Sequence, residues 1–428
     1  MNTPAKEACR RPLKQLALAA ALAGALAAGV TALPANAAPS LSPDTPASLT
    51  KQRLQREVEK TLEEAGYVSV SVQVREGRHR VHATAGEAEL GSGRPVARNS
   101  DFRAASVTKT FVATVVLQLV AEGRLSLGDT VEKWLPGVVT GNGNDGSHIT
   151  IRNLLQHTSG IYNYNVIEDF GETAADFERH RFDHVSPEQN IAGAMKHKPD
   201  FPPADANDPK PDWNYSNPGY ILAGMVIEKA TGRTWAQEVH DRIVRPLGLK
   251  STYEPGDDPY LKEPYAHTYQ RFPGSTGWTD TSVRNMSWGD AAGSLISSER
   301  DLDRFYTALL TGRLLPAAQL AEMRRTVVPN EDILQVMPGL RYGLGLMRQP
   351  LSCGGYRWGH GGDLDGHTVR TGFTADGRRS VVISASGKTA DDEQLFRAEL
   401  TVQRLTDVAL CGTGTDTAKG IGTKGTPR

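Results

Sequence analysis

A serine and a lysine three residues apart stand at the start of a strongly apolar segment. Residues 103–110 read RAASVTKT and lead directly into FVATVVLQLV, which ends near Gly123. A helix this apolar is expected to be buried, with Ser106 and Lys109 on one face of its first turn. The helix dipole and the free backbone N–H groups there favour an oxyanion beside Ser106. Burial lowers the pKa of a lysine, and a neutral amine is the base that a serine nucleophile needs.

The pair also has a purely structural interpretation, in which Ser106 caps the helix and Lys109 extends its amine towards solvent. S-x-x-K is too short to decide between the two interpretations. Two later stretches favour catalysis: DWNYSNPGY contains Tyr215 and Asn217 before an amphipathic helix, and RWGHGGDLDGH contains His360 beside a predicted strand. Taken alone, these three would be a core tyrosine, a helix cap and a turn residue.

The order of the three stretches resembles a known signature. S-x-x-K, then Y-x-N, then a K/H-x-G triplet is similar to the motif set of the penicillin-recognising serine hydrolases. The Tyr-type second motif and the His-type third motif resemble the branch of secreted D-alanyl-D-alanine carboxypeptidases, with class C β-lactamases and esterases as relatives. LLQHTSG at 154–160 and GSLIS at 293–297 also resemble family sequence. The similarity covers roughly residues 50–410.

The resemblance implies a catalytic set of Ser106, Lys109, Tyr215, Asn217 and His360. Ser106 would attack a carbonyl while Lys109 and Tyr215 share its proton, and Tyr215 would protonate the leaving group. Asn217 would orient Lys109 and the substrate amide. Water would then release the acyl group, so no metal and no organic cofactor is expected.

The third motif would bind the substrate. The resemblance implies an oxyanion hole formed by the backbone N–H groups of Ser106 and Asp363. Gly361 and Gly362 would let the substrate backbone lie along the strand edge. These expectations make Gly361, Gly362 and Asp363 the predicted substrate-binding residues.

The third motif also departs from the carboxypeptidases, which resemble H-T-G-T at this point and grip the substrate's terminal carboxylate with threonine hydroxyls. Here the sequence is His360-Gly361-Gly362-Asp363, so both hydroxyls are missing. An Asp363 carboxylate that pointed into the site would repel a substrate carboxylate. Arg348 is a candidate for the arginine expected on the preceding strand, but a shift of one residue would turn it to the opposite face.

The favoured function is therefore a D-alanyl-D-alanine carboxypeptidase or related D-peptidase that acts on cell-wall peptides of the peptidoglycan type. β-Lactams are possible acylating ligands. An esterase or β-lactamase using the same site is the first alternative, and an endopeptidase or aminopeptidase remains open. A non-catalytic protein that binds wall peptides or β-lactams is the alternative from another class.

Predicted strands occur at both ends of the chain, YVSVSVQVREG and RHRVHATAGEAEL early, and YGLGLM, HTVRTGFTA and RSVVISAS late. Residues 124–330 are mostly helical in pattern. We therefore predict an α+β fold in a catalytic domain over 49–411: one antiparallel sheet, built from both termini and flanked by helices, with a largely helical inserted subdomain at about 124–330.

The ends of the chain suggest export. Residues 1–37 combine a basic start, an apolar run and Ala35-Asn36-Ala37, which is typical of a cleaved signal peptide, with an uncleaved membrane anchor as the alternative. Residues 38–48 are a predicted linker and 412–428 a predicted disordered tail. Cleavage leaves Cys353 and Cys411, which we predict to pair in an oxidising compartment, although two unrelated thiols are possible. The protein would be secreted without a stable membrane anchor.

Other chemistries lack sequence support. The formal net charge is -1 and no long basic run follows the signal, so a nucleic-acid binder is not expected. The G-x-G-x-x-G match at 141–146 follows no hydrophobic strand and is interpreted as a flexible turn. The sequence has no phosphate-binding loop of the G-x-x-x-x-G-K-[ST] type, no H-E-x-x-H and no C-x-x-C. His157 is interpreted as a structural residue.

Overall fold

The computed structural model describes residues 49–166, 170 and 172–412. The predicted signal peptide (1–37), the predicted linker (38–48) and all but the first residue of the predicted tail lie outside these residues. Within the described ranges, the helices are too short or too polar to cross a membrane. Secretion therefore stays a prediction.

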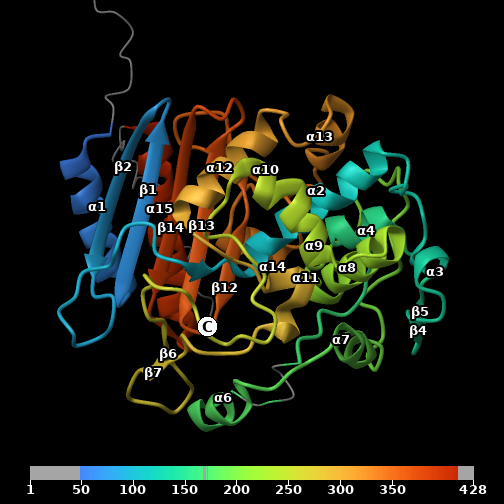
Figure 1. The fold of residues 1–428 in the computed structure, drawn as a ribbon, viewed down its shortest axis with the longest axis horizontal. Helices are drawn as coiled ribbons and strands as arrows, with labels where there is room; N and C mark the ends of the chain where they lie inside the picture. Colours follow the sequence, from blue (N-terminus) through green and yellow to red (C-terminus); the bar gives the residue numbers. More distant parts are fainter. Residues whose placement is uncertain (1–48, 167–169, 171, 413–428) are drawn as a thin grey trace, which may run out of the picture. The chain divides into compact units, whose positions relative to one another are not determined.

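An antiparallel sheet contains strands from both ends of the chain (Figure 1). Its strands are β1 (Ser69–Glu76), β2 (His79–Gly86), β9 (Arg341–Tyr342), β10 (Met347–Pro350), β11 (Tyr356–Gly359), β12 (Gly361–Leu364), β13 (His367–Thr374) and β14 (Arg379–Ser386). The order is β2-β1-β14-β13-β11-β10-β9, and β12 pairs with β13 beside this path. β1, from the N-terminal part of the chain, pairs with β14, from the C-terminal part, over the whole length of both strands, from Ser69↔Ser386 to Glu76↔Arg379. The predicted α+β fold is confirmed.

Helices cover both faces of this sheet. The valines of β1 lie in an apolar core beneath α1 (Lys51–Ala65) and α15 (Asp392–Cys411). The polar residues that alternate with them face α12 (Glu299–Leu310), where Arg75 pairs with Asp303 at 2.8 Å. Strict alternation in the sequence therefore marks two buried faces of different chemistry rather than one buried and one solvated face.

The segment 124–330 gathers beside the sheet as mostly short helices (Figure 1). The helices outside the sheet layers are α2 (Thr108–Ala121), α3 (Val131–Trp134), α4 (Ile151–Gln156), α6 (Ala174–His180), α7 (Pro187–Ala194), α8 (Asn217–Thr231), α9 (Trp235–Val239), the π-helical turn His240–Val244, α10 (Arg245–Leu247), the 3-10 turn Ser287–Gly289, α11 (Asp290–Gly293), α13 (Ala317–Met323) and α14 (Glu331–Val336). Short strands accompany them: β3 (Phe102–Arg103) with β8 (Ile296–Ser297), β4 (Thr140–Gly141) with β5 (Asn144–Asp145), and β6 (Tyr269–Arg271) with β7 (Thr279–Asp280) and β15 (Lys388–Thr389).

The G-x-G-x-x-G match forms the turn between β4 and β5. Gly141, Asn142 and Gly143 have φ of 91°, 50° and 92°, a left-handed conformation that glycine and asparagine adopt in tight hairpins. Neither a long strand nor a helix adjoins this turn in the way that a dinucleotide site requires. The interpretation as a turn is confirmed.

α2 is the central helix of the molecule, as its apolar sequence predicts. Its residues from Thr108 to Leu117 are all buried, and Phe111 stacks on Phe305 of α12 with the ring centroids 3.6 Å apart. α8, α9, α11 and α13 pack around it. The first turn of α2 is thereby held between the helical segment and the sheet.

The predicted disulfide is present. Cys353, in the turn between β10 and β11, is bonded to Cys411, the last residue of α15. The bond joins the end of α15 to the turn between two neighbouring strands of the sheet.

Candidate active site

Ser106 lies in the 3-10 turn Ala105–Val107, which leads directly into α2. Ala105 has a φ of 49°, a conformation that is unfavourable for a residue with a Cβ atom and that recurs at functional turns. Ser106 is the one residue between 101 and 117 that is not buried. The turn therefore presents the Ser106 hydroxyl at the surface of an otherwise closed core.

Lys109 is completely buried, and its amine makes three polar contacts. Lys109 Nζ lies 3.0 Å from Ser106 Oγ, 2.8 Å from Asn217 Oδ1 and 2.7 Å from the Ala292 carbonyl oxygen. Burial lowers the pKa of Lys109 well below its usual value, so the neutral amine is favoured. The two carbonyl oxygens can only accept, so they take both N–H groups of a neutral amine and leave its lone pair for the Ser106 hydroxyl.

Tyr215 completes the proton-handling group. Burial raises the pKa of Tyr215, so the phenol stays protonated through neutral pH. Its hydroxyl interacts with the Ser106 side chain, which lowers the pKa of Tyr215 in part, and its ring centroid lies 4.8 Å from Lys109 Nζ. Ser106, Lys109 and Tyr215 are thus brought together as the sequence predicts.

Asn217 begins α8 but does not cap it. The cap is Ser216, whose hydroxyl accepts from the Gly219 N–H, so the Asn217 side chain is free to hold Lys109. The Asn217 backbone N–H donates to Asn163 Oδ1 at 2.9 Å. The residue that caps α8 is therefore Ser216 and not Asn217.

His360 belongs to a buried chain of hydrogen bonds. His360 Nδ1 lies 2.6 Å from the Gly361 carbonyl oxygen, and His360 Nε2 lies 2.9 Å from the Tyr342 hydroxyl. That hydroxyl is 3.1 Å from His157 Nε2, and His157 Nδ1 accepts from the Ser216 N–H at 3.1 Å. One proton assignment satisfies every contact: Ser216 donates to His157, His157 to Tyr342, Tyr342 to His360, and His360 to Gly361.

This assignment needs both histidines to be neutral. Burial lowers the pKa of His360 to about 3 and that of His157 well below its usual value. The chain ties the start of β12 to the backbone beside Tyr215. Both ring nitrogens of His360 are engaged in it, so the geometry favours a positioning role for His360, and its membership of the catalytic set stays a prediction.

β12 lies directly against the 3-10 turn that contains Ser106. A Cβ atom on Gly362 would come within 2.5 Å of the Ala104 carbonyl oxygen and 3.1 Å of the Ser106 backbone nitrogen. A Cβ atom on Gly361 would meet only the Arg370 side chain, at 3.3 Å. Glycine at 362 is therefore required for the close approach of β12 to Ser106. An oxyanion hole formed by the backbones of both segments would need the same close approach.

The Asp363 carboxylate does not lie free in the site. It contacts Arg370 Nη1 at 2.9 Å and Lys388 Nζ at 3.2 Å, and it accepts from the Thr368 hydroxyl. Burial alone would raise the pKa of Asp363, but the charges of Arg370 and Lys388 outweigh it and hold this pKa well below its usual range.

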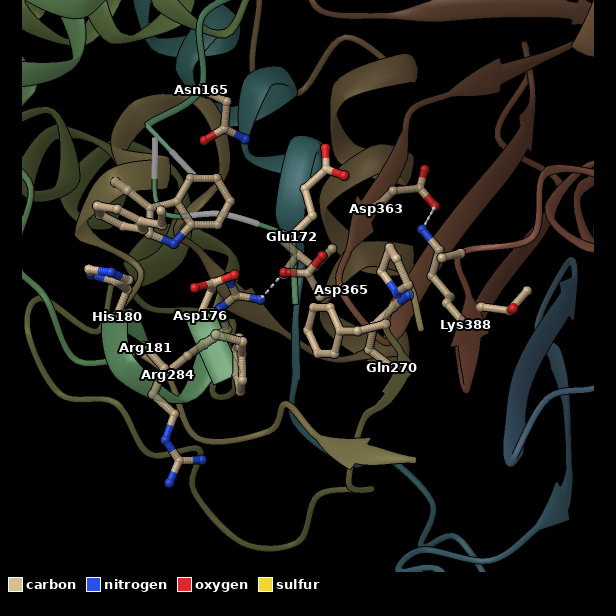
Figure 2. Close-up of a pocket in the computed structure, with 18 of the residues that line it drawn as sticks. Asn165, Glu172, Asp176, His180, Arg181, Gln270, Arg284, Asp363, Asp365 and Lys388 are labelled. Atoms are coloured by element: carbon tan, nitrogen blue, oxygen red, sulfur yellow. Dashed lines mark hydrogen bonds and ion pairs between the residues drawn. The ribbon is translucent and has the colours of Figure 1, made fainter. Parts of the chain in front are cut away.

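Three cavities adjoin this strand. A small one of about 70 Å³ contains Ser106, Asn217 and Asp363 in its wall. A larger one of about 500 Å³ shares Asp363 and Trp288 with it and is lined by aromatic and charged side chains (Figure 2). A third of about 410 Å³ shares Asp363 and Lys388 with the larger one. Asp363 therefore lines all three cavities.

The comparisons with known proteins agree with this geometry. Residues 54–404 match the family model described as Beta-lactamase. The chain belongs to the Beta-lactamase family. A solved D-stereospecific amidohydrolase from Streptomyces sp. is 41% identical with a TM-score of 0.73, and the match covers 85% of this chain and 100% of that one. The D-amino acid amidase from Ochrobactrum anthropi SV3 is 24% identical with a TM-score of 0.68, covers 83% of this chain and 99% of that one, and supports the fold alone.

Curated relatives match over shorter stretches. Penicillin-binding protein 4* from Bacillus subtilis (strain 168) is 32% identical over 44% of this chain and 38% of its own length. Esterase EstB from Burkholderia gladioli is 34% identical over 42% of this chain and 45% of its own length. The chain thus spans less than half the length of these two relatives.

Some members of the site in this Beta-lactamase-family chain were not found from the sequence. Tyr342 and the Ala292 carbonyl contact site residues, but no motif marks either of them. Arg348, the candidate for a carboxylate-binding arginine, instead stacks over the Tyr356 ring at 4.2 Å. Among the described residues, no group of three or more potential ligands could hold a metal ion.

Proposed function

We propose that this protein is a serine hydrolase that forms an acyl-enzyme at Ser106 and cleaves amide bonds of D-amino-acid peptides or D-amino-acid amides. The observation that carries the proposal is the buried Lys109 amine, which has both N–H groups held by Asn217 and Ala292 and its lone pair available to Ser106. A lysine kept neutral in this way can serve as the base for the serine. The preference for D-amino acids is supported by the 41% identity to a D-stereospecific amidohydrolase.

The proposed reaction uses the contacts already described. Ser106 Oγ attacks the carbonyl carbon as Lys109 takes the hydroxyl proton. Tyr215 donates its proton to the leaving amine and regains one from Lys109. Water then attacks the acyl carbon and gives a proton to the same pair of side chains, which pass a proton to Ser106 Oγ as its bond to the acyl carbon breaks and the acid is released. The backbone N–H groups of Ser106 and Asp363 stabilise the oxyanion in both halves.

Cell-wall peptides are the proposed natural substrates, because the predicted signal peptide would export the protein and the chain resembles a penicillin-binding protein. A D-alanyl-D-alanine carboxypeptidase is one form of this activity. An esterase is the second candidate, supported by the 34% identity to Esterase EstB. β-Lactams are expected to acylate the same serine.

The test uses protein beginning at residue 38 and its Ser106→Ala variant. N-acetyl-D-Ala-D-Ala, its C-terminal amide and the corresponding L,L peptides are compared by release of the leaving group, and a simple activated ester is included. Wild type is expected to cleave a D,D substrate faster than its L,L counterpart and to cleave the ester, and Ser106→Ala is expected to lose about a thousandfold or more. Mass spectrometry should find one acyl group on Ser106 after treatment with a slow β-lactam.

Hydrolysis that survives in Ser106→Ala would exclude the proposed nucleophile. Wild-type protein that binds the peptides but hydrolyses neither peptide nor ester would favour the non-catalytic binder.

A further inference from the structure

Asp363 forms ion pairs with two cationic side chains, those of Arg370 and Lys388. Its carboxylate lies within 2.9 Å of Arg370 Nη1 and 3.2 Å of Lys388 Nζ. Figure 2 shows Asp363 and Lys388 facing each other across the wall of the larger cavity. The Asp363 side chain is 47% exposed, so this carboxylate is accessible from the cavities.

The charges of this network cancel. Arg370 is also held by Glu399, with Nη2 to Oε2 at 2.5 Å and Nε to Oε2 at 3.0 Å. The two positive charges of Lys388 and Arg370 are therefore balanced by the two negative charges of Asp363 and Glu399. Without Asp363, one positive charge of the network would be left uncompensated beside the cavities that Asp363 lines.

The backbone that carries Asp363 is held close to the turn at Ser106. Asp363 follows Gly362, where a Cβ atom would come within 2.5 Å of the Ala104 carbonyl oxygen and 3.1 Å of the Ser106 backbone nitrogen. Asp363 lines the small cavity with Ser106 and also both larger cavities, while Lys388 lines only the two larger ones. A substrate group that left the small cavity next to Asp363 would meet this ion-paired network.

We infer that the Asp363 carboxylate stands in for the terminal carboxylate of a substrate, occupying Lys388 and Arg370 so that the site accepts uncharged groups at this position. The substrate class is then C-terminal amides, esters and internal peptide bonds rather than free peptide acids. A peptide acid would have to displace Asp363 or place a second negative charge beside it, and either is unfavourable. The inference concerns the same site as the proposed function and rests on it.

The experiment measures binding in the Ser106→Ala background, where no turnover occurs. N-acetyl-D-Ala-D-Ala and its C-terminal amide are titrated by calorimetry at fixed ionic strength. The parent is expected to bind the amide about tenfold or more tighter than the acid, and Asp363→Asn should shift this ratio towards the acid by about tenfold or more, the effect of one charge-assisted hydrogen bond. Adding Lys388→Met to Asp363→Asn should reverse the shift.

Asp365→Asn is the matched control. Asp365 lines the same larger cavity but pairs with Arg284 at 2.9 Å, so its neutralisation should change the acid-to-amide ratio by less than about threefold. Asp363→Ala serves as a second variant, and thermal melting checks that each variant is folded. An equal ratio in parent and Asp363→Asn, or a parent that prefers the acid, would overturn the inference.

Hydrolysis of the neutral activated ester separates this inference from the proposed function. If the ester is cleaved with dependence on Ser106 and the binding ratios stay unchanged, only the assignment of Asp363 fails. If the ratios shift as expected while no substrate is hydrolysed, the assignment stands and the hydrolase proposal fails.

Discussion

Burial moves the pKa values of Lys109 and Tyr215 in opposite directions. Each shift favours the uncharged form, because a closed apolar environment penalises the ammonium of lysine and the phenolate of tyrosine alike. The two shifts together favour a neutral base and a neutral acid around Ser106. The arrangement separates proton acceptor from proton donor without any charged partner.

The pH dependence of hydrolysis follows from these two directions. For a neutral ester, kcat/KM should rise with pH as Lys109 loses its proton, reach its plateau below the ordinary lysine value of about 10.4, and stay on it while Tyr215 remains protonated. A pH profile of the purified protein checks this. An acidic limb centred near the ordinary lysine value would contradict it.

Lys109→Arg is the control for that profile. A guanidinium keeps its proton at all accessible pH values, so the variant should lose about a thousandfold or more in kcat/KM at every pH. Because Lys109 is fully buried, its substitution can also destabilise the protein, so the melting temperature of Lys109→Arg is measured together with the kinetics.

At the scale of elements, the site depends on the contact between β12 and the 3-10 turn at Ser106. Two pieces of chain distant in sequence approach there without side chains between them. The hydrogen-bonded chain through His360, Tyr342 and His157 connects the same strand to the start of α8. Three elements that carry the site are thereby fixed relative to one another.

Gly362→Ala should damage catalysis more than Gly361→Ala. The added methyl group at 362 would push against backbone atoms of Ala104 and Ser106, whereas at 361 it would meet a side chain that can move. Displacement of β12 by several tenths of an ångström is expected to lower kcat/KM by about a hundredfold for Gly362→Ala, and Gly361→Ala should cost less than about fivefold. Steady-state kinetics on the ester measure both. Equal losses in the two variants would contradict the proposed contact.

At the scale of the whole molecule, the N-terminal and C-terminal parts of the described chain pack together in one sheet. β1 from the N-terminal part pairs with β14 from the C-terminal part, and α1 packs beside α15. The helical segment is inserted between them, and the 3-10 turn with Ser106 precedes α2 at the boundary. The stability of the site is therefore coupled to the joining of the two chain ends.

The disulfide should stabilise this closure. Cys353 and Cys411 are 58 residues apart in sequence, and a cross-link of that span is worth about 4 kcal/mol in the chain-entropy estimate. The variant with both cysteines changed to serine should melt roughly 5 °C or more below the oxidised wild type. Wild type melted in a reducing agent is the control and should match it. Equal melting temperatures in oxidised and reduced wild type would show that the bond adds nothing.

Local patterns in the sequence were sufficient to predict the Ser106–Lys109 pair and the fold class. S-x-x-K before an apolar run defined Ser106 and Lys109, because burial of such a helix and the spacing of its polar residues are local properties. Alternation in the terminal segments indicated the strands of the sheet, and the motif order added Tyr215 and Asn217. The two cysteines that lie outside the predicted signal peptide were enough to predict their pairing.

Tertiary structure decided what depends on contacts between distant segments. The Ala292 carbonyl and Tyr342 belong to no motif, and only folding brings them to Lys109 and His360. The sequence by itself determined that Asp363 follows the glycines of the third motif. The tertiary structure decided that Lys388 and Arg370 hold this carboxylate, through the pairing of β12 with β13 and the placement of β15. The sequence could not show this, because electrostatic interactions depend on separation in space and not on separation along the chain.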